Sequence, residues 1–216
     1  MLTRRALLAA AGSVALPRLA LAAQPAPAPI PPLPLSIAVA AGDGGPVRDA
    51  AWVEEQLAQA GALFTPLGIP LVRVASRSLP AAHAQLETRA NRDALASFLE
   101  PKRINVFVIS SLRDVDDPRL YRMGVHWRNR KQPGKRYVIV AASARPTTLA
   151  HELGHYFSLD HSGVTDNVMS YDRSGGPVFF DDKQAERMRT AARMNVAGKL
   201  LDAAPTPTPA PEGQAR

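Results

Sequence analysis

Hydrophobic residues recur in two patterns between residues 35 and 201. Four short apolar runs predict β-strands, because they are bounded by turn residues or polar segments and are too short for most helices: 35–41, 67–76, 103–110 and 137–142. The last two runs are apolar at almost every position, which is typical of central strands buried on both faces of a sheet.

Three other stretches have apolar side chains at the three- and four-residue spacing that predicts helices. The first begins at Pro46, and the second, the alanine-rich stretch 80–99, is more weakly patterned. The third follows Asp181, which can cap a helix together with Gln184. Strands and helices together predict one domain over residues 35–201, long enough to bury a sizeable core.

Residues 1–23 have the parts of an export signal. Adjacent arginines, Arg4 and Arg5, precede an apolar run and a tail of small residues, and their setting resembles a twin-arginine signal. Arg18 interrupts the apolar run well short of membrane-spanning length, so we expect a cleaved signal rather than a membrane anchor. The protein would be periplasmic or secreted, and the sequence leaves twin-arginine and general secretion open as routes.

The proline content, net charge and cysteine count add a few constraints on domain bounds and binding partners. Residues 24–34 and 202–216 are rich in proline and predict a linker and a disordered tail. Residues 1–23 hold three arginines and no acid, so their removal lowers the formal net charge from +7 to +4. This balance does not indicate nucleic-acid binding. The chain has no cysteine, so its stability must come from its core. After signal removal we expect no membrane span, and a monomer.

Three of the five histidines lie in one segment, HELGHYFSLDH, from His151 to His161. On a helix, His151 and His155 would point from one face, with Glu152 beside them. His161 can reach the same point if the helix ends near Ser158 and the chain turns back. Three imidazoles with an open fourth position are a usual ligand set for catalytic zinc, and a carboxylate beside the bound water is a general base.

This segment resembles the metzincin pattern of zinc peptidases, HExxHxxGxxH followed by a methionine-containing turn. Asn167-Val168-Met169-Ser170-Tyr171 places Met169 eight residues after His161, as in that clan. One position departs, because Ser158 stands where the family has glycine. Glycine suits a left-handed turn that costs other residues about 1–2 kcal/mol, so the departure concerns the turn more than the ligands.

The resemblance implies an α+β fold, similar to an α/β sandwich. It would contain a mixed twisted sheet with an antiparallel edge strand, a zinc helix capped by Thr147 or Thr148, the methionine turn and a C-terminal helix. Residues 123–127 are the candidate edge strand, which would pair with an extended substrate peptide; an ordinary loop is the alternative. Met169 would form an apolar floor beneath the ligands. Tyr171 would bind the metal or stabilise the transition state, or simply pack.

Residues 111–136 form a long polar connection before the last predicted strand, and loops of this length are usually functional or mobile. Its basic residues include Arg119, Arg122, Arg128, Arg130, Lys131, Lys135 and Arg136. They either form an ordinary solvated loop or line the cleft, where they would favour acidic substrates or an anionic envelope surface.

We therefore expect an exported zinc metalloendopeptidase, a hydrolase that holds one zinc ion and cleaves proteins or peptides. Its expected site residues are His151, His155 and His161 for the metal and Glu152 and Tyr171 for catalysis. The alternative is a catalytically silent, zinc-containing binding module of the cell envelope, which Ser158 supports. Structural zinc usually has four protein ligands, so a fourth ligand such as Asp160 would favour that alternative.

Overall fold

The computed structural model describes residues 28–130, 132 and 134–205. The expected export signal, residues 1–23, lies outside the described residues, as do the first part of the expected linker, Lys131 and the end of the expected tail. Within the described part of the chain, no helix is long and apolar enough to cross a membrane.

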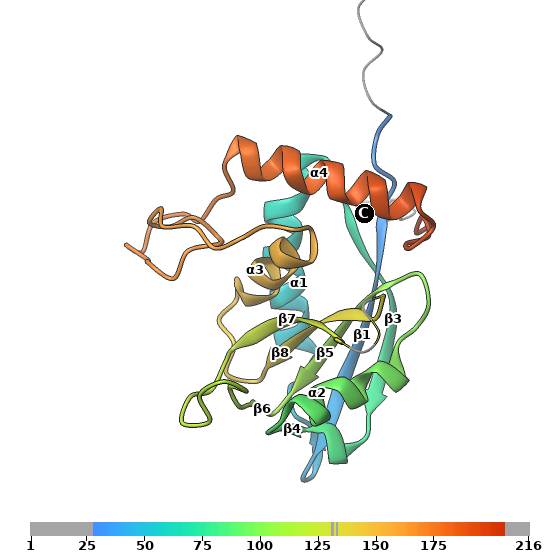
Figure 1. The fold of residues 1–216 in the computed structure, drawn as a ribbon, viewed down its shortest axis with the longest axis vertical. Coiled ribbons are helices and arrows are strands. Elements are labelled where there is room, and N and C mark those ends of the chain that lie inside the picture. Colours follow the sequence, from blue (N-terminus) through green and yellow to red (C-terminus); the bar gives the residue numbers. More distant parts are fainter. Residues whose placement is uncertain (1–27, 131, 133, 206–216) are drawn as a thin grey trace, which may run out of the picture.

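A mixed, twisted sheet forms the centre of the fold (Figure 1). Its strands are β1 (Leu33–Gly42), β2 (Gly45–Pro46), β3 (Leu71–Leu79), β5 (Ile104–Ile109), β7 (Gly124–Arg128) and β8 (Arg136–Ala141). Strands β3, β1, β5 and β8 lie side by side and parallel, and β7 pairs antiparallel with β8 at the edge. The expected mixed sheet with an antiparallel edge strand is confirmed, and the candidate segment 123–127 lies in and next to β7.

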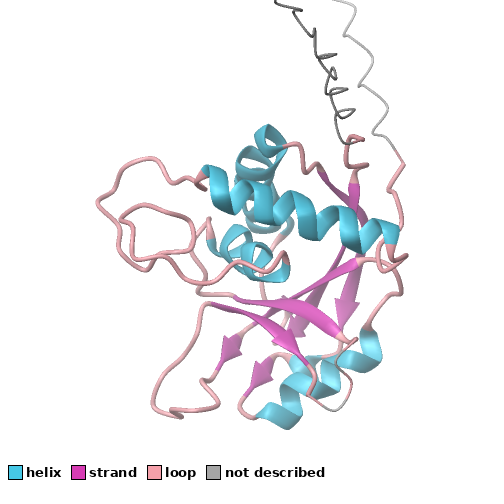
Figure 2. Ribbon diagram, turned by 45° about the horizontal axis from the view of Figure 1, so that its top comes forward, coloured by secondary structure: helices cyan, strands magenta, loops and turns pink. Residues whose placement is uncertain are grey.

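Helices lie on both faces of this sheet (Figures 1 and 2). One face carries α1 (Ala50–Phe64), α3 (Thr148–Tyr156) and α4 (Asp182–Ala197). The other carries α2 (Arg89–Ala94) and a small sheet of β4 (Gln85–Leu86) and β6 (Ser111–Leu112). The described part of the chain also forms three short 3₁₀ turns: η1 (Thr65–Leu67), η2 (Ala81–His83) and η3 (Leu95–Phe98).

The central strands supply both cores in alternation. Val106 of β5 and Val138 of β8 belong to the core beneath α1, α3 and α4. Phe107 and Tyr137 belong to the opposite core, where their ring centroids lie 5.4 Å apart. Successive side chains of a strand point to opposite faces, so both strands are buried on both sides, as their nearly continuous apolar runs predict.

The N-terminal boundary of the domain lies earlier than expected. Strand β1 begins at Leu33, which is fully buried, and Ile30 is also buried, although both were expected in the linker. Leu33, Leu35 and Ile37 face the same core, so the alternation of inward and outward side chains that is typical of a strand continues across Pro34. Pro34 lacks an N–H, but pairing with β5 begins after it.

At the other end, Ala204 is buried and its N–H donates to the carbonyl of Pro32, with 2.7 Å between nitrogen and oxygen. The expectation of a disordered tail from residue 202 is therefore wrong at its start. Although prolines follow Ala204 in the sequence, it has its own backbone N–H and can therefore form this hydrogen bond.

Two other expectations differ from the structure. Residues 80–99 do not form one helix, because residues 85–86 pair with β6 and a capping box of Thr88 and Asn91 begins the short α2 afterwards. Pro46 lies in β2, and Asp49 instead caps α1 by accepting the N–H of Trp52. The capping box of Asp181 and Gln184 at the start of α4 is confirmed.

Candidate metal centre and the cleft around it

Helix α3 positions two of the three histidines. Leu149 and Leu153 face the core, which leaves His151 and His155 on the opposite, partly exposed side. Thr147 occupies the position before the helix, but its side chain makes no capping hydrogen bond, so this part of the expectation is wrong.

A side chain of another helix, far away in the sequence, forms hydrogen bonds at the start of α3 instead. Gln56 of α1 accepts the N–H of Leu149 over 3.2 Å and donates to the carbonyl of Arg145 over 2.9 Å. The amide side chain thus satisfies one donor at the helix start and one acceptor just before it. No local pattern around the histidine motif indicates this role of Gln56.

Ser158 allows the chain to turn back after α3. Its φ of 72° lies in the left-handed region, although it is not glycine. Its N–H donates to the carbonyl of His155, and the N–H of Leu159 donates to the carbonyl of Gly154, over 3.0 and 2.9 Å. These two bonds form a Schellman motif, the common end of an α-helix. The serine thus adopts the conformation that glycine favours, and the turn keeps its geometry.

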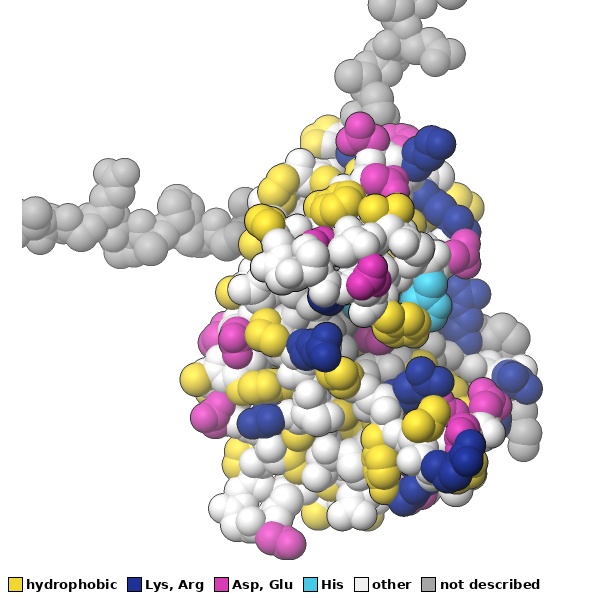
Figure 3. All heavy atoms as spheres, turned by 90° about the vertical axis from the view of Figure 1, so that its left-hand side faces the viewer, with side chains coloured by type: hydrophobic (Ala, Val, Ile, Leu, Met, Phe, Trp, Pro, Cys, Tyr) yellow, Lys and Arg dark blue, Asp and Glu magenta, His cyan; other side chains and the backbone are white. Residues whose placement is uncertain are grey.

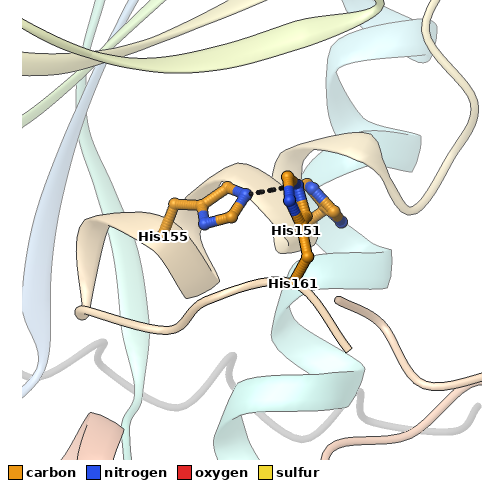
Figure 4. A group of neighbouring side chains, drawn as sticks. All are labelled: His151, His155 and His161. Carbon is orange, nitrogen blue, oxygen red and sulfur yellow. Dashed lines mark hydrogen bonds between the residues drawn. The ribbon is translucent and has the colours of Figure 1, made fainter. Parts of the chain in front are cut away.

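The turn brings His161 back to the other two histidines. Figure 4 shows the three rings directed toward one another, two from α3 and one from the segment after it. The Nε2 atoms of His155 and His161 lie 3.1 Å apart, and one ligand atom from each of the three residues falls within 4.8 Å of the others. His83 lies elsewhere and packs against Phe98.

The second ring nitrogens show that this set fits a metal ion. Nδ1 of His151 lies 2.8 Å from the carbonyl oxygen of Val168, and Nδ1 of His155 lies 2.8 Å from that of Leu159. A carbonyl can only accept, so both Nδ1 atoms carry a hydrogen, and in the neutral form of each ring Nε2 is the nitrogen that offers a lone pair. Burial lowers the pKa of His151 to about 4 and also lowers that of His161, which keeps both rings neutral near pH 7.

Glu152 lies between the histidines and the edge strand. It is buried, and its carboxylate accepts the backbone N–H of His126 in β7. Burial raises the pKa of Glu152 to about 8, and the His126 hydrogen bond lowers it by a smaller amount. β7 approaches closely because Gly124 has no side chain: a Cβ there would lie 2.8 Å from the Cγ atom of Glu152.

The segment after His161 forms the floor of the site. Met169 is fully buried and packs so closely beneath α3 that a Cβ on Gly154 would lie 2.4 Å from its sulfur. The side chain of Asn167 accepts the N–H of Met169 and exchanges two hydrogen bonds with Gln184 at the start of α4. Asn167 and Gln184 thus hold the turn in place, a role beyond the helix cap that the sequence predicts for Gln184.

Tyr171 and Asp160 flank the exposed side of the site. The hydroxyl of Tyr171 lies 2.8 Å from Nε2 of His161, and the residue is 70% exposed. Asp160 pairs with Arg187 over 3.0 Å and is not part of the histidine group. Among the histidines and acidic residues that the structure describes, the candidate ligands are therefore the three histidines, and the hydroxyl of Tyr171 lies next to them.

A cleft of about 810 Å³ lies over the histidines and runs along β7. Figure 3 shows Lys and Arg side chains on several sides of the exposed histidine surface. The arginines that line this cleft are Arg89, Arg92, Arg122, Arg128, Arg130 and Arg187. Three of them come from the basic connection 111–136, whereas Arg119 pairs with Asp117 and Arg136 donates to Asn195. The cleft is thus rich in positive charge.

Comparison with known proteins gives matches among solved structures. No protein-family model and no curated protein match the sequence. Mature mirolysin of Tannerella forsythia in complex with a cleaved peptide matches with a TM-score of 0.57 and 15% identity, over 82% of this chain and 100% of that chain.

Two further structures match with a TM-score of 0.53 and 17% identity, over 75% of this chain: archaemetzincin of Methanopyrus kandleri, over 96% of its chain, and metalloproteinase-II of Bacteroides fragilis, over 53% of its chain. At such low identity the likeness concerns the fold. The protein therefore has the fold of the metzincin-type metalloproteases.

Proposed function

We propose that the protein is an exported zinc-dependent metalloendopeptidase. The observation that carries this proposal is the convergence of three imidazoles beside a buried acidic side chain, in a cleft that runs along the edge strand β7. His151, His155 and His161 would hold the zinc ion. The expected signal in residues 1–23 supports export, and the likeness to proteases supports a peptide substrate.

A zinc ion at this site would supply Lewis-acid polarisation of the scissile carbonyl and a lower pKa for water. In its ionised form, Glu152 accepts the proton that the attacking water loses, and it then delivers this proton to the leaving amine. Its hydrogen bond from the backbone of His126 holds the carboxylate beside the histidines. The hydroxyl of Tyr171 donates toward the carbonyl oxygen, where negative charge develops during the attack.

Strand β7 binds the substrate backbone. It is an edge strand, and alternate residues of an antiparallel strand direct their N–H and C=O groups away from the partner strand. The outward N–H of His126 donates to Glu152, and the other outward groups of β7 can pair with a substrate. An extended peptide adds to such an edge through main-chain hydrogen bonds, which do not depend on the peptide sequence. The protein would therefore cleave unfolded or extended segments within a chain.

The test is Glu152→Gln, which keeps the shape of the side chain and removes its ability to take a proton. We expect bound zinc, measured by atomic absorption, to stay at the parent level, while cleavage of an unfolded protein falls by at least about a hundredfold. Equal cleavage by parent and variant would remove Glu152 from the mechanism. If the parent protein does not bind zinc, the proposed zinc-dependent function is wrong.

A further inference from the structure

A second hollow, of about 300 Å³, adjoins His151 and shares part of its lining with the large cleft. Both hollows are lined by His151, Glu152 and Tyr171, so the second one lies directly beside the place of peptide cleavage. It is bounded by the start of α3, the start of β7 and the segment that follows Met169. A substrate residue next to the cleaved bond can therefore place its side chain there.

Three arginines line this hollow, and two of them have no acidic partner. Arg122 pairs with Asp114, but Arg145 and Arg173 form no ion pair with the described residues. Glu152 is the one acidic residue among those that line it. Unpaired positive charge in a concave site attracts anions and concentrates the local field.

The guanidinium of Arg173 is held by the main chain. Its Nη1 donates to the carbonyls of Asn167 and Asp172 over 2.9 and 3.0 Å, and its Nη2 donates to the carbonyl of Val168 over 3.2 Å. These bonds use three of its five N–H groups. Among the described residues, no acceptor meets the Nε hydrogen or the second Nη2 hydrogen. Neighbouring donors of this kind match the two oxygens of one carboxylate.

Nearby acidic residues do not neutralise Arg173. Asp166 has a lowered pKa, but the main cause is its hydrogen bonds from Ser174, and the charge of Arg173 is a smaller contribution. Asp172, the preceding residue, accepts a hydrogen bond from Thr165 instead. The positive charge of Arg173 therefore lies at a fixed position and can interact with a ligand.

The backbone of Arg145 is also fixed. Its carbonyl accepts hydrogen bonds from Gln56 and from the N–H of Thr148. The side chain itself is exposed and can swing toward a bound anion. One rigid arginine and one adaptable arginine therefore meet at the same hollow.

We infer that this hollow is a specificity pocket for an acidic side chain, and that the enzyme prefers Asp or Glu at one of the two positions that flank the cleaved bond. Arg173 would bind the carboxylate with two hydrogen bonds, and Arg145 would add charge. This inference rests on the proposed peptidase function. It makes Arg173 and Arg145 specificity residues, not catalytic ones.

The test uses pairs of peptides that differ by Glu or Gln next to the cleaved bond. Cleavage positions come first from mass spectrometry of a mixed peptide library, and kcat and KM are then measured separately for each pair. All peptides carry an amidated C-terminus, so that the side chain is the source of the carboxylate. We expect the parent enzyme to prefer Glu over Gln by about tenfold or more.

Three matched variants each remove one positive charge: Arg173→Gln, Arg145→Gln and Arg73→Gln. Arg173→Gln should lower the Glu-to-Gln preference about tenfold, and Arg145→Gln about two- to fivefold, because it is more exposed. Arg73 lies in β3, from which β1, β5 and β8 separate the edge strand β7, and it pairs with Glu54 of α1, so Arg73→Gln should leave the preference unchanged. Zinc content is measured in each variant, since Val168 accepts hydrogen bonds from both Arg173 and His151.

The possible outcomes separate this inference from the proposed function. If the library is cleaved without preference for acidic residues, or if Arg173→Gln and Arg145→Gln both keep the preference, the pocket assignment is wrong while the peptidase stands. The same peptides with a free C-terminus are run as a second set, and cleavage of that set alone would also overturn the side-chain assignment. If no peptide is cleaved by zinc-loaded protein, the proposed function fails instead. Binding of the Glu and Gln peptides to Glu152→Gln, followed by fluorescence anisotropy, gives a readout that does not depend on turnover.

Discussion

Ser158 shows how a single residue can depart from a motif and keep its geometry. The left-handed conformation at its φ of 72° costs a non-glycine residue about 1–2 kcal/mol. Ser158→Gly should therefore raise the free energy of unfolding by about 1 kcal/mol, measured by urea denaturation. Part of the relief is offset because glycine has more freedom in the unfolded chain.

Ser97→Gly is the matched control. Ser97 lies in the right-handed turn η3 (Leu95–Phe98) and is exposed, and its hydroxyl donates to the carbonyl of Ala94. The same chemical change there also removes this hydrogen bond and should lower the free energy of unfolding by about 1–2 kcal/mol. Opposite signs for the two variants would support the conformational explanation. A loss of stability in both would show that the Ser158 side chain contributes more than its strain costs.

Contacts between residues that are far apart in the sequence could not be predicted from local patterns. The local spacing of His151, His155 and His161 sufficed to predict that the three rings converge. The support of the helix start by Gln56 was not predicted, because it joins residues 93 positions apart. For the same reason, the placement of Arg145 and Arg173 at one hollow has no signal in the local pattern.

At the scale of elements, central strands were predicted better than the short elements around them. β5 and β8 carry nearly continuous apolar runs, and all four of their ends lie within one residue of the predicted bounds. Residues 80–99 were misjudged because an alanine-rich composition does not reveal that residues 85–86 pair with β6. Tertiary pairing overrides helix propensity in so short a segment.

Strand β7 contacts α3 closely at Gly124. A Cβ on Gly124 would lie 2.8 Å from the side chains of both Glu152 and Thr148, so Gly124→Ala must displace the strand or the carboxylate. We expect kcat/KM for peptide cleavage to fall by about a hundredfold, since misplacement of a reacting group by about 1 Å has effects of that size. Zinc content should stay unchanged, because the histidines do not contact Gly124.

Gly61→Ala provides the comparison for that variant. Gly61 lies inside α1, and nothing lies within 4 Å of a Cβ there, so alanine should leave activity unchanged and stabilise the helix. If Gly124→Ala retained full activity, the close contact between β7 and Glu152 would have no role in catalysis.

Over the whole molecule, the candidate metal centre and the main core share residues. Leu149 and Leu153 of α3, Val168 and Met169 belong to the same buried cluster as side chains of the sheet, α1 and α4. The ligands of the site come from α3 and from the segment that Met169 anchors. A ligand that joins these two parts therefore stabilises the packing of the entire domain, and not a local loop alone.

This coupling predicts that zinc removal lowers the thermal stability of the whole domain. A ligand at a thousandfold excess over its Kd stabilises the folded state by about 4 kcal/mol, which corresponds to roughly 10 °C for a domain of this size. Calorimetry with zinc and with chelator should show this difference for the parent and for the control His83→Ala, whose ring packs against Phe98. His161→Ala should melt at nearly the same temperature in both conditions, because it loses one of three ligands. Identical melting of the parent with and without zinc would mean that the three imidazoles do not hold the ion in the folded state.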